Sequence, residues 1–340
     1  GRVTIAMVAG PAWPLGAQET TSELSPEVAE LTALCEMIRE QPASVSDQQV
    51  VDAIKKAAEL QRPFLAERAL RVYLATQTNP SQAVRLHAID SARRVGDYNG
   101  AMVRSKRYLA SASPGAEASR VAATMYWIQI DVLKLIDDAY RTMGSDLDRF
   151  CSGNDARKFD AWYLKQAAER RDYVNLARRL TAIHSSKMSL EQIRYFYTGY
   201  VDLLLASASR PSEDNLDAAD ELAQLARVIK DDERTRQRCA FYAANLTFAR
   251  SMEDLEPADR EQKLAPVLAA ARNYIAKTPD AEALYDAMSV LGGGGNWGTY
   301  LSDAYQGQQK RDFFVESFGK LPVEQQQAML DGRRQQLDRR

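Results

Sequence analysis

Apolar residues recur every three or four positions along most of this chain, the spacing that places side chains on one face of an α-helix. Val28, Leu31 and Leu34 follow this spacing after Ser25 and Pro26, which suit the cap and the first position of a helix. Good helix formers (Ala, Leu, Gln, Glu and Arg) fill long stretches, whereas runs of β-branched residues are scarce. The pattern therefore predicts an all-α chain.

Turn residues divide this pattern into separate helices. Pro42-Ala43-Ser44 ends the first helix, and Ser46-Asp47 caps a second one that runs to about Leu60. Further helices are predicted over Phe64–Thr76, Ser81–Val95, Leu190–Ser207, Leu216–Ile229, Arg234–Met252, Pro257–Lys277 and Ala281–Leu291, with a last helix after Pro322.

A short phrase recurs at the ends of predicted helices. It reads Arg-x-Tyr-Leu-Ala over residues 71–75, Arg-Tyr-Leu-Ala over residues 107–110 and, in degenerate form, Arg-Asn-Tyr-Ile-Ala over residues 272–276. Tyr73 and Tyr108 are 35 positions apart, and Ala53 and Ala88 keep the same offset. Because a period near 35 is the length of a helix–turn–helix unit, it predicts an array of antiparallel helical hairpins.

The clearest predicted joint between two helices is the segment 96–101, Gly-Asp-Tyr-Asn-Gly-Ala. Gly96 can take the left-handed conformation that ends a helix, and Asp97 can cap the next one. Arg171-Asp172-Tyr173 repeats the joint without the glycine, so we expect turns at both places and near Gln61–Arg62.

These residues resemble the tetratricopeptide-repeat pattern, in which Gly-Asp-Tyr-x-x-Ala joins the two helices and Pro closes the unit. The resemblance is best over residues 81–114 and extends over 45–185, with a degenerate unit that includes Ser119–Met143. The chain lacks the usual Trp-Leu-Gly of the first helix. The resemblance implies a right-handed α-solenoid and binding of a protein or peptide. Beyond Lys187 the pattern is less periodic, so we expect a less regular helical C-terminal half.

Composition divides the chain into four segments. Residues 1–17 are expected to be a signal-peptide remnant, 18–44 a lead segment with the first helix, 45–207 the repeats, and 208–340 a C-terminal helical region. The segment 207–214, Ser-Ala-Ser-Arg-Pro-Ser-Glu-Asp, reads as the linker, and the glycine run at 292–295 as a second break. The polar, uncapped helix at Arg340 predicts that the natural chain continues.

The N-terminal segment has the features of an exported protein. An apolar stretch over residues 3–13 is followed by Pro14, then Leu15-Gly16-Ala17, and then by polar residues. This order is typical of a secretory signal, so we expect cleavage after Ala17 and a periplasmic or extracellular mature chain. The stretch is too short and too rich in Pro and Gly to span a membrane. The alternative is a buried N-terminal helix or strand.

Charge and motifs give little support for chemistry. The net charge of −2 and the pI of about 5.9 argue against a dedicated nucleic-acid binder. The glycine run lacks the Lys and Ser/Thr of a phosphate loop, only His87 and His184 are present, and the three cysteines form no Cys-x-x-Cys pair. We therefore predict no cofactor, no metal ligand and no catalytic residue.

Aromatic clusters are the candidate partner-binding residues. Tyr126 and Trp127, with Tyr195 and Tyr197, are expected to line a groove in the region 85–200, or alternatively to fill the core between repeats. The favoured function is an exported, non-catalytic scaffold or adaptor that binds protein or peptide. The alternative is the helical part of a secreted polysaccharide-active or other hydrolytic enzyme, whose catalytic carboxylates come from distant positions or lie beyond Arg340.

Overall fold

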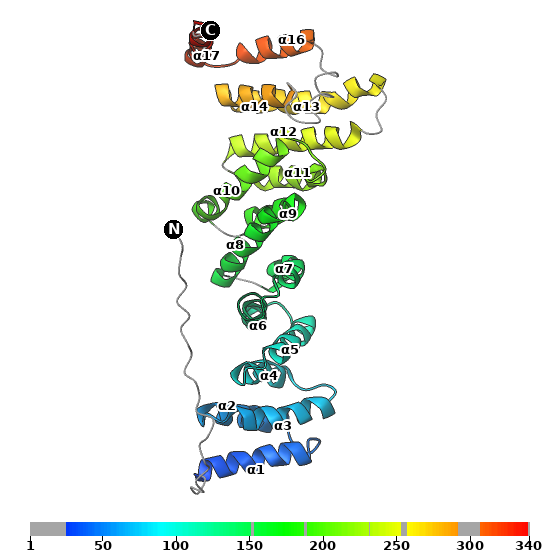
Figure 1. The fold of residues 1–340 in the computed structure, drawn as a ribbon, viewed down its shortest axis with the longest axis vertical. Helices are drawn as coiled ribbons and strands as arrows, with labels where there is room; N and C mark the ends of the chain where they lie inside the picture. Colours follow the sequence, from blue (N-terminus) through cyan, green and yellow to red (C-terminus); the bar gives the residue numbers. More distant parts are fainter. Residues whose placement is uncertain are drawn as a thin grey trace. The chain divides into compact units, whose positions relative to one another are not determined.

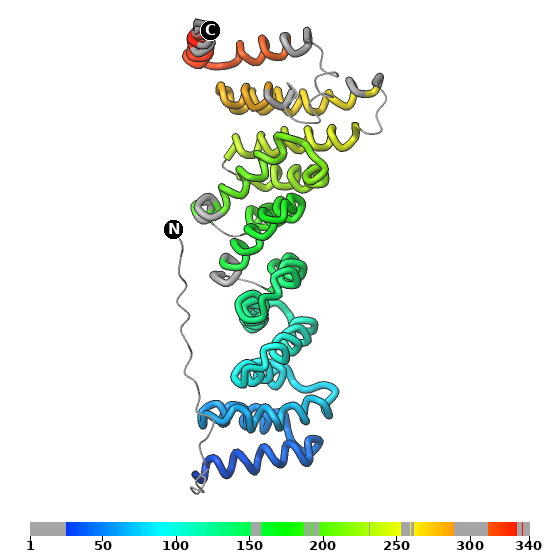
Figure 2. Tube along the Cα trace, viewed as in Figure 1, coloured from blue at the N-terminus to red at the C-terminus, as the bar shows by residue number. Residues whose placement is uncertain are grey.

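The computed structural model describes residues 25–150, 153–186, 189–230, 232–252, 257–291 and 307–338. Every element assigned within these ranges is a helix, so the predicted all-α class is confirmed (Figure 1, Figure 2). The predicted signal segment and the glycine run lie outside the described residues. None of the described helices is both long enough and apolar enough to cross a membrane.

The chain divides into two compact units. Unit 1 comprises Gly1–Ser113 with Asp131–Leu133, and unit 2 comprises Pro114–Ile130 with Lys134–Arg340. The boundary expected between residues 207 and 208 lies within unit 2, where helices before and after it pack together.

Unit 1 contains five α-helices in its described part. They are α1 (Pro26–Glu40), α2 (Asp47–Glu59), α3 (Pro63–Thr76), α4 (Gln82–Arg94) and α5 (Tyr98–Ser111).

Unit 2 contains the remaining elements. They are α6 (Ala116–Trp127), the π-helix η1 (Ile128–Val132), which reaches the segment grouped with unit 1, α7 (Ile136–Phe150), α8 (Gly153–Glu169), α9 (Tyr173–Ser185), α10 (Leu190–Ala208), the 3-10 helix η2 (Leu216–Ala218), α11 (Ala219–Val228), α12 (Glu233–Ser251), α13 (Pro257–Lys277), α14 (Ala281–Leu291), α16 (Gly307–Phe318) and α17 (Val323–Asp338).

Helix starts follow the capping residues in the sequence. Ser25 caps α1 with Pro26 at its first position, and Ser46 forms a capping box with Gln49 at the start of α2. Two expected segments differ in detail. In the degenerate unit expected over 119–143, the π-helix η1 follows α6 before α7 begins, and the helix expected over 216–229 starts as a 3-10 turn. Helix α16 was not predicted.

Three helix-to-helix joints share one backbone geometry. The joint residues Gln61, Gly96 and Arg171 all have positive φ, at 55°, 77° and 55°. In each joint the next backbone N–H donates to an alanine carbonyl at 2.7–2.9 Å; the acceptors are Ala57, Ala92 and Ala167. This six-residue closure satisfies carbonyls at the end of the first helix, so it reverses the chain within three residues. The turns lie where the sequence predicted them.

Two tyrosines fasten hairpins in unit 1. The Tyr73 hydroxyl donates to Asp47, the first residue of α2, while the Tyr108 hydroxyl accepts from Gln82 Nε2, on the first residue of α4, at 2.8 Å. The end of α3 therefore lies beside the start of α2, and the end of α5 lies beside the start of α4. Both pairs, α2–α3 and α4–α5, are antiparallel, and their tyrosines keep the 35-residue offset.

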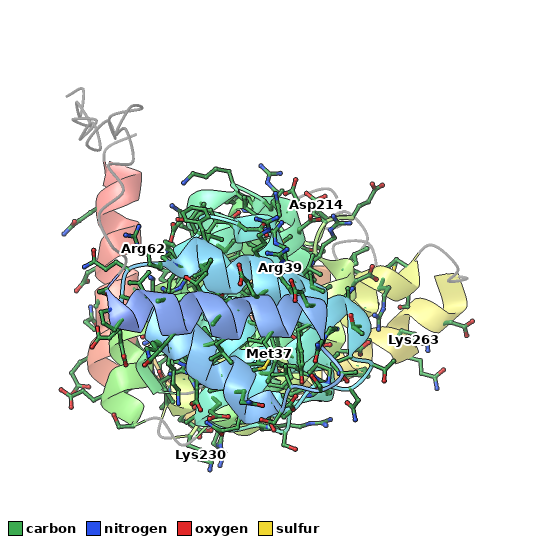
Figure 3. All side chains as sticks on the ribbon, turned by 90° about the horizontal axis from the view of Figure 1, so that it is seen from below. Met37, Arg39, Arg62, Asp214, Lys230 and Lys263 are labelled. Carbon is green, nitrogen blue, oxygen red and sulfur yellow. The ribbon has the colours of Figure 1, made fainter. Side chains whose placement is uncertain are left out.

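These tyrosines are part of the core of unit 1. Tyr73, Tyr108 and Leu109 are only 2%, 2% and 4% exposed. Leu74, the neighbour of Tyr73, is only partly buried and lines a surface pocket between α3 and α5. Figure 3 looks onto α1, on which Met37 is labelled and 37% exposed.

In unit 2, α12 has buried side chains along much of its length. It packs against α11 and α13 and lies between them in Figure 1. Phe241 is fully buried and its ring lies 5.2 Å from that of Tyr242 and 6.2 Å from that of Tyr274, centroid to centroid. Aromatic packing of this kind buries large areas, so it anchors the middle of unit 2.

Candidate binding site

Two of the four predicted partner-binding aromatics, Tyr126 and Tyr197, are core residues. Tyr126 is 0% exposed; its hydroxyl donates to Asp146 at 2.5 Å and its ring lies 5.7 Å from that of Phe159. Tyr197 is 1% exposed, and Trp127 is partly buried. The side chain of Tyr195 lies outside the described residues. Tyr126 and Tyr197 thus stabilise unit 2 and present no surface to a partner in this conformation.

A surface pocket of about 290 Å³ lies in unit 1, between the end of α3 and the helices α4 and α5. Arg85, Arg104 and Arg107 contribute its basic side chains. The other lining residues are Leu74, Gln77, Thr78, Pro80, Ala88 and Tyr108. No Asp or Glu of the described chain lines it. The pocket therefore combines three guanidinium groups with an apolar wall, and we call it the arginine pocket.

Arg85 is held in position by neutral acceptors. One guanidinium nitrogen donates to Ser111 Oγ at 3.1 Å and the other to Asn79 Oδ1 at 2.6 Å. Ser111 ends α5 and Asn79 lies in the link before α4, so Arg85 connects both sides of the hairpin. Because serine and asparagine oxygens carry no net charge, they orient the guanidinium without neutralising it.

Arg104 has a different environment. It donates to both carboxylate oxygens of Glu67, at 2.6 and 2.9 Å, and to the Ala88 carbonyl at 2.7 Å. Arg71 and the Ser91 hydroxyl also donate to Glu67, whose side chain is only 4% exposed. Burial alone would raise the pKa of Glu67, but the bonds from Arg104, Arg71 and Ser91 outweigh it and lower that pKa. Arg104 is therefore a structural cation with its charge already balanced.

A second pocket of about 290 Å³ shares Pro80, Arg85 and Tyr108 with the first and extends toward Ser81 and Gln82. A carboxylate borders it, because the Ser81 backbone N–H donates to Asp47 Oδ2 at 2.6 Å. The positive side of this region is therefore the arginine pocket, and the side near Asp47 is less favourable for an anion.

Unit 2 has a smaller pocket of about 40 Å³ beside His184, with Asp202, Ile229 and Asp232 among its lining residues. Burial lowers the pKa of His184, and the charge of Asp232 opposes this shift. The space holds little more than a water molecule. The described residues contain no group of three or more His, Cys, Asp or Glu arranged to hold a metal ion.

The cysteines described by the structure are buried thiols. Burial raises the pKa of Cys35 to about 11 and that of Cys239 to about 12, so both stay protonated near neutral pH. Cys151 lies outside the described residues.

Sequence reasoning missed the arginine pocket. A signal was present: Arg104, Arg107, Tyr108 and Ser111 follow the i, i+3, i+4, i+7 spacing and so share one face of α5. The spacing does not show that Arg104 pairs with Glu67 while Arg85 donates to the neutral oxygens of Ser111 and Asn79.

No protein-family model matches the chain, and neither a curated protein nor a solved structure matches it significantly.

Proposed function

We propose that the chain is a non-catalytic helical-repeat scaffold or adaptor, exported from the cytoplasm, that binds a protein or peptide through unit 1. The observation that carries the proposal is the recurrence of the same construction in α2–α3 and α4–α5. Each hairpin closes on a left-handed residue, and each fastens its end tyrosine to the first residue of its partner helix. Repeated hairpins stacked as in a tetratricopeptide-type solenoid expose equivalent residues side by side, which suits an extended partner.

The arginine pocket supports the same proposal. It is open to solvent, and it carries polar and apolar groups together. Such a combination is typical of peptide recognition, in which apolar walls give affinity and a few polar groups fix orientation.

Peptide binding is tested by panning a phage-displayed random peptide library against the immobilised full chain. We expect enriched peptides that protect amides of residues 74–112 from hydrogen exchange. A matched panning against the Glu67→Gln and Arg104→Ala double variant, which removes one cation that lines the pocket together with its buried partner, measures how far the pocket contributes. Enrichment no better than on an unrelated helical protein would contradict the proposal.

Export is tested separately, by N-terminal sequencing of the protein from its native host. The apolar stretch before Leu15-Gly16-Ala17 motivates the expectation of a chain that starts at Gln18. An intact segment 1–17 in a cytoplasmic fraction would reverse this part of the proposal. Release of new reducing ends from polysaccharide, lost on mutation of an acidic residue, would instead establish the enzyme alternative.

A further inference from the structure

The arginine pocket contains two cations whose charge no neighbouring carboxylate balances. Among the described residues, Arg85 donates only to the neutral oxygens of Asn79 and Ser111, and Arg107 is exposed at the pocket with no ion pair. Arg104 behind them is already matched to Glu67. The pocket therefore has a net positive charge, although the whole chain carries −2.

The positions of the two cations suit one small anionic group. Arg85 projects from α4 and Arg107 from α5, and both line the same 290 Å³ space. A guanidinium has five N–H donors, and the two bonds of Arg85 use only part of this capacity. Because Asn79 and Ser111 hold it in place, Arg85 has less side-chain entropy to lose when it binds an oxyanion.

The remaining walls indicate which anion fits. Leu74, Pro80, Ala88 and the Tyr108 side chain give the pocket an apolar surface. A bare inorganic ion would leave that surface unused, whereas a peptide carboxylate brings an aliphatic stem or a neighbouring side chain that covers it. The volume matches one or two residues of a bound segment and is too small for a folded domain.

Resting on the function proposed above, we propose that the arginine pocket binds a carboxylate of an acidic peptide segment of a partner protein. The carboxylate lies between Arg85 and Arg107 and accepts N–H bonds from both. Its apolar part packs on Leu74, Pro80 and Tyr108. The side near Asp47 stays free of the anion because of that residue's negative charge.

The test measures binding of unlabelled, N-acetylated peptides to the full chain by isothermal titration calorimetry. One peptide contains glutamate, glycine and leucine with an amidated C-terminus. A second has glutamine in place of glutamate and a free C-terminal carboxylate, and a third has glutamine and an amidated C-terminus. We expect the first or second peptide to bind at least about tenfold more tightly than the third, since only the third lacks a carboxylate.

The variants Arg85→Gln and Arg107→Gln remove one cation each, and each is expected to weaken binding about tenfold or more. Arg94→Gln is the matched control, because Arg94 is an exposed arginine of α4 that does not line the pocket. Arg85→Gln removes hydrogen bonds to Asn79 and Ser111 and can therefore disturb the hairpin. Arg107 is exposed, so Arg107→Gln is expected to keep the fold and tests the pocket independently.

Equal binding by the glutamate and glutamine amides, with no preference for a free C-terminus, would overturn the carboxylate site while leaving peptide binding intact. An equal loss in Arg94→Gln would reduce the effect to general charge attraction. Displacement by inorganic phosphate at the concentration of the peptide would assign the pocket to small anions in general. Absence of saturable binding up to about 1 mM would also end the proposal, and peptide panning would then judge the scaffold function independently.

Discussion

Arg104 in unit 1 and Arg179 in unit 2 occupy corresponding positions in their helices, but their charged neighbours differ. Each lies seven residues after the aspartate that caps its helix, Asp97 for α5 and Asp172 for α9. Each is bonded to a carboxylate that is only 4% exposed, Glu67 in one case and Asp160 in the other. In both helices this position thus holds a largely buried arginine, and the charged residues around each arginine determine the local charge balance.

The balance differs because the numbers of cations and carboxylates differ. Glu67 accepts bonds from Arg104 and Arg71, and Arg71 also pairs with Asp97 at 2.7 Å, so two cations face two carboxylates. Arg179 pairs with Asp160 and with Asp148, so one cation serves two carboxylates. Burial raises the pKa of Asp160, the charge of Asp148 adds to the rise, and Arg179 only partly offsets it, whereas the pKa of Glu67 is lowered. Unit 1 therefore holds a tight ion pair at a place where unit 2 holds a carboxyl group that resists ionisation.

The largest expected effect comes from truncating the arginine itself. Arg104→Ala leaves Glu67 buried with Arg71 as its only cation, so we expect a loss of roughly 3–5 kcal/mol in the free energy of unfolding at neutral pH. Arg179→Ala is expected to cost less, because Asp160 can take up a proton. Urea denaturation followed by far-UV circular dichroism measures both. The double variant Arg104→Ala, Glu67→Gln should recover part of the loss, and equal costs for the two single variants would contradict the comparison.

A second contrast compares Leu109 in α5 with His184 in α9. Each lies twelve residues after the aspartate that caps its helix. Leu109 is 4% exposed and His184 is partly buried. Leu109→Ala is expected to cost about 2–4 kcal/mol, since the tightly packed hairpin cannot collapse around the cavity. His184→Ala removes a side chain at the edge of a small pocket and should cost about 1 kcal/mol or less. A denaturation midpoint that moves less for Leu109→Ala than for His184→Ala would place Leu109 outside the core.

Local signals in the sequence predicted much of the fold. Ser25, Ser46 and Asp97 mark helix starts, Gly96 marks a helix end, and the 35-residue offset of Tyr73 and Tyr108 indicates hairpin repetition. These signals work because capping and chain reversal depend on a few adjacent residues.

Features that depend on distant residues were not predictable in the same way. The arginine pocket draws on three separate segments, and the reason that Arg85 differs from Arg104 is the position of Glu67 on another helix. The aromatic candidates show the same limit: density along the sequence does not tell whether Tyr126 faces Phe159 or solvent. The interpretation of aromatics as core was among the alternatives, and burial favours it for Tyr126 and Tyr197.

The comparison of the two acids predicts opposite responses to pH. Because the folded-state pKa of Glu67 is lowered, its contribution is present above its unfolded pKa of about 4.3 and is lost as pH falls through the folded value. Because that of Asp160 is raised, its contribution is full below the unfolded pKa of about 3.9 and is lost as pH rises through the folded value.

Urea denaturation at pH values from about 3 to 7 measures these slopes. The advantage of the native chain over Glu67→Gln should shrink toward acid, whereas its advantage over Asp160→Asn should grow toward acid. Asp214→Asn, at an exposed carboxylate, is the control for general charge effects. If the difference in the free energy of unfolding changes with pH in the same direction for both variants, the two carboxyl groups respond alike. The difference in charge balance then does not affect their ionisation in solution.

The smallest expected effects concern the turns, where the two units place different residues in the same left-handed backbone conformation. Gly96 and Arg171 both have positive φ, which costs an L-residue with a Cβ about 1 kcal/mol and costs glycine little. A Cβ built on Gly96 meets no atom within 4 Å, so Gly96→Ala carries only this conformational cost and should lose about 1 kcal/mol. Arg171→Gly removes the cost in unit 2, but it also frees the unfolded chain and loses the exposed ion pair to Asp214; these small contributions nearly cancel, so a net change within about 0.5 kcal/mol of zero is expected. Arg171→Ala separates the two contributions, because it keeps the Cβ and removes the ion pair. If thermal denaturation shows Arg171→Gly to be no more stable than Arg171→Ala, the left-handed turn at residue 171 is not a source of strain in the folded chain.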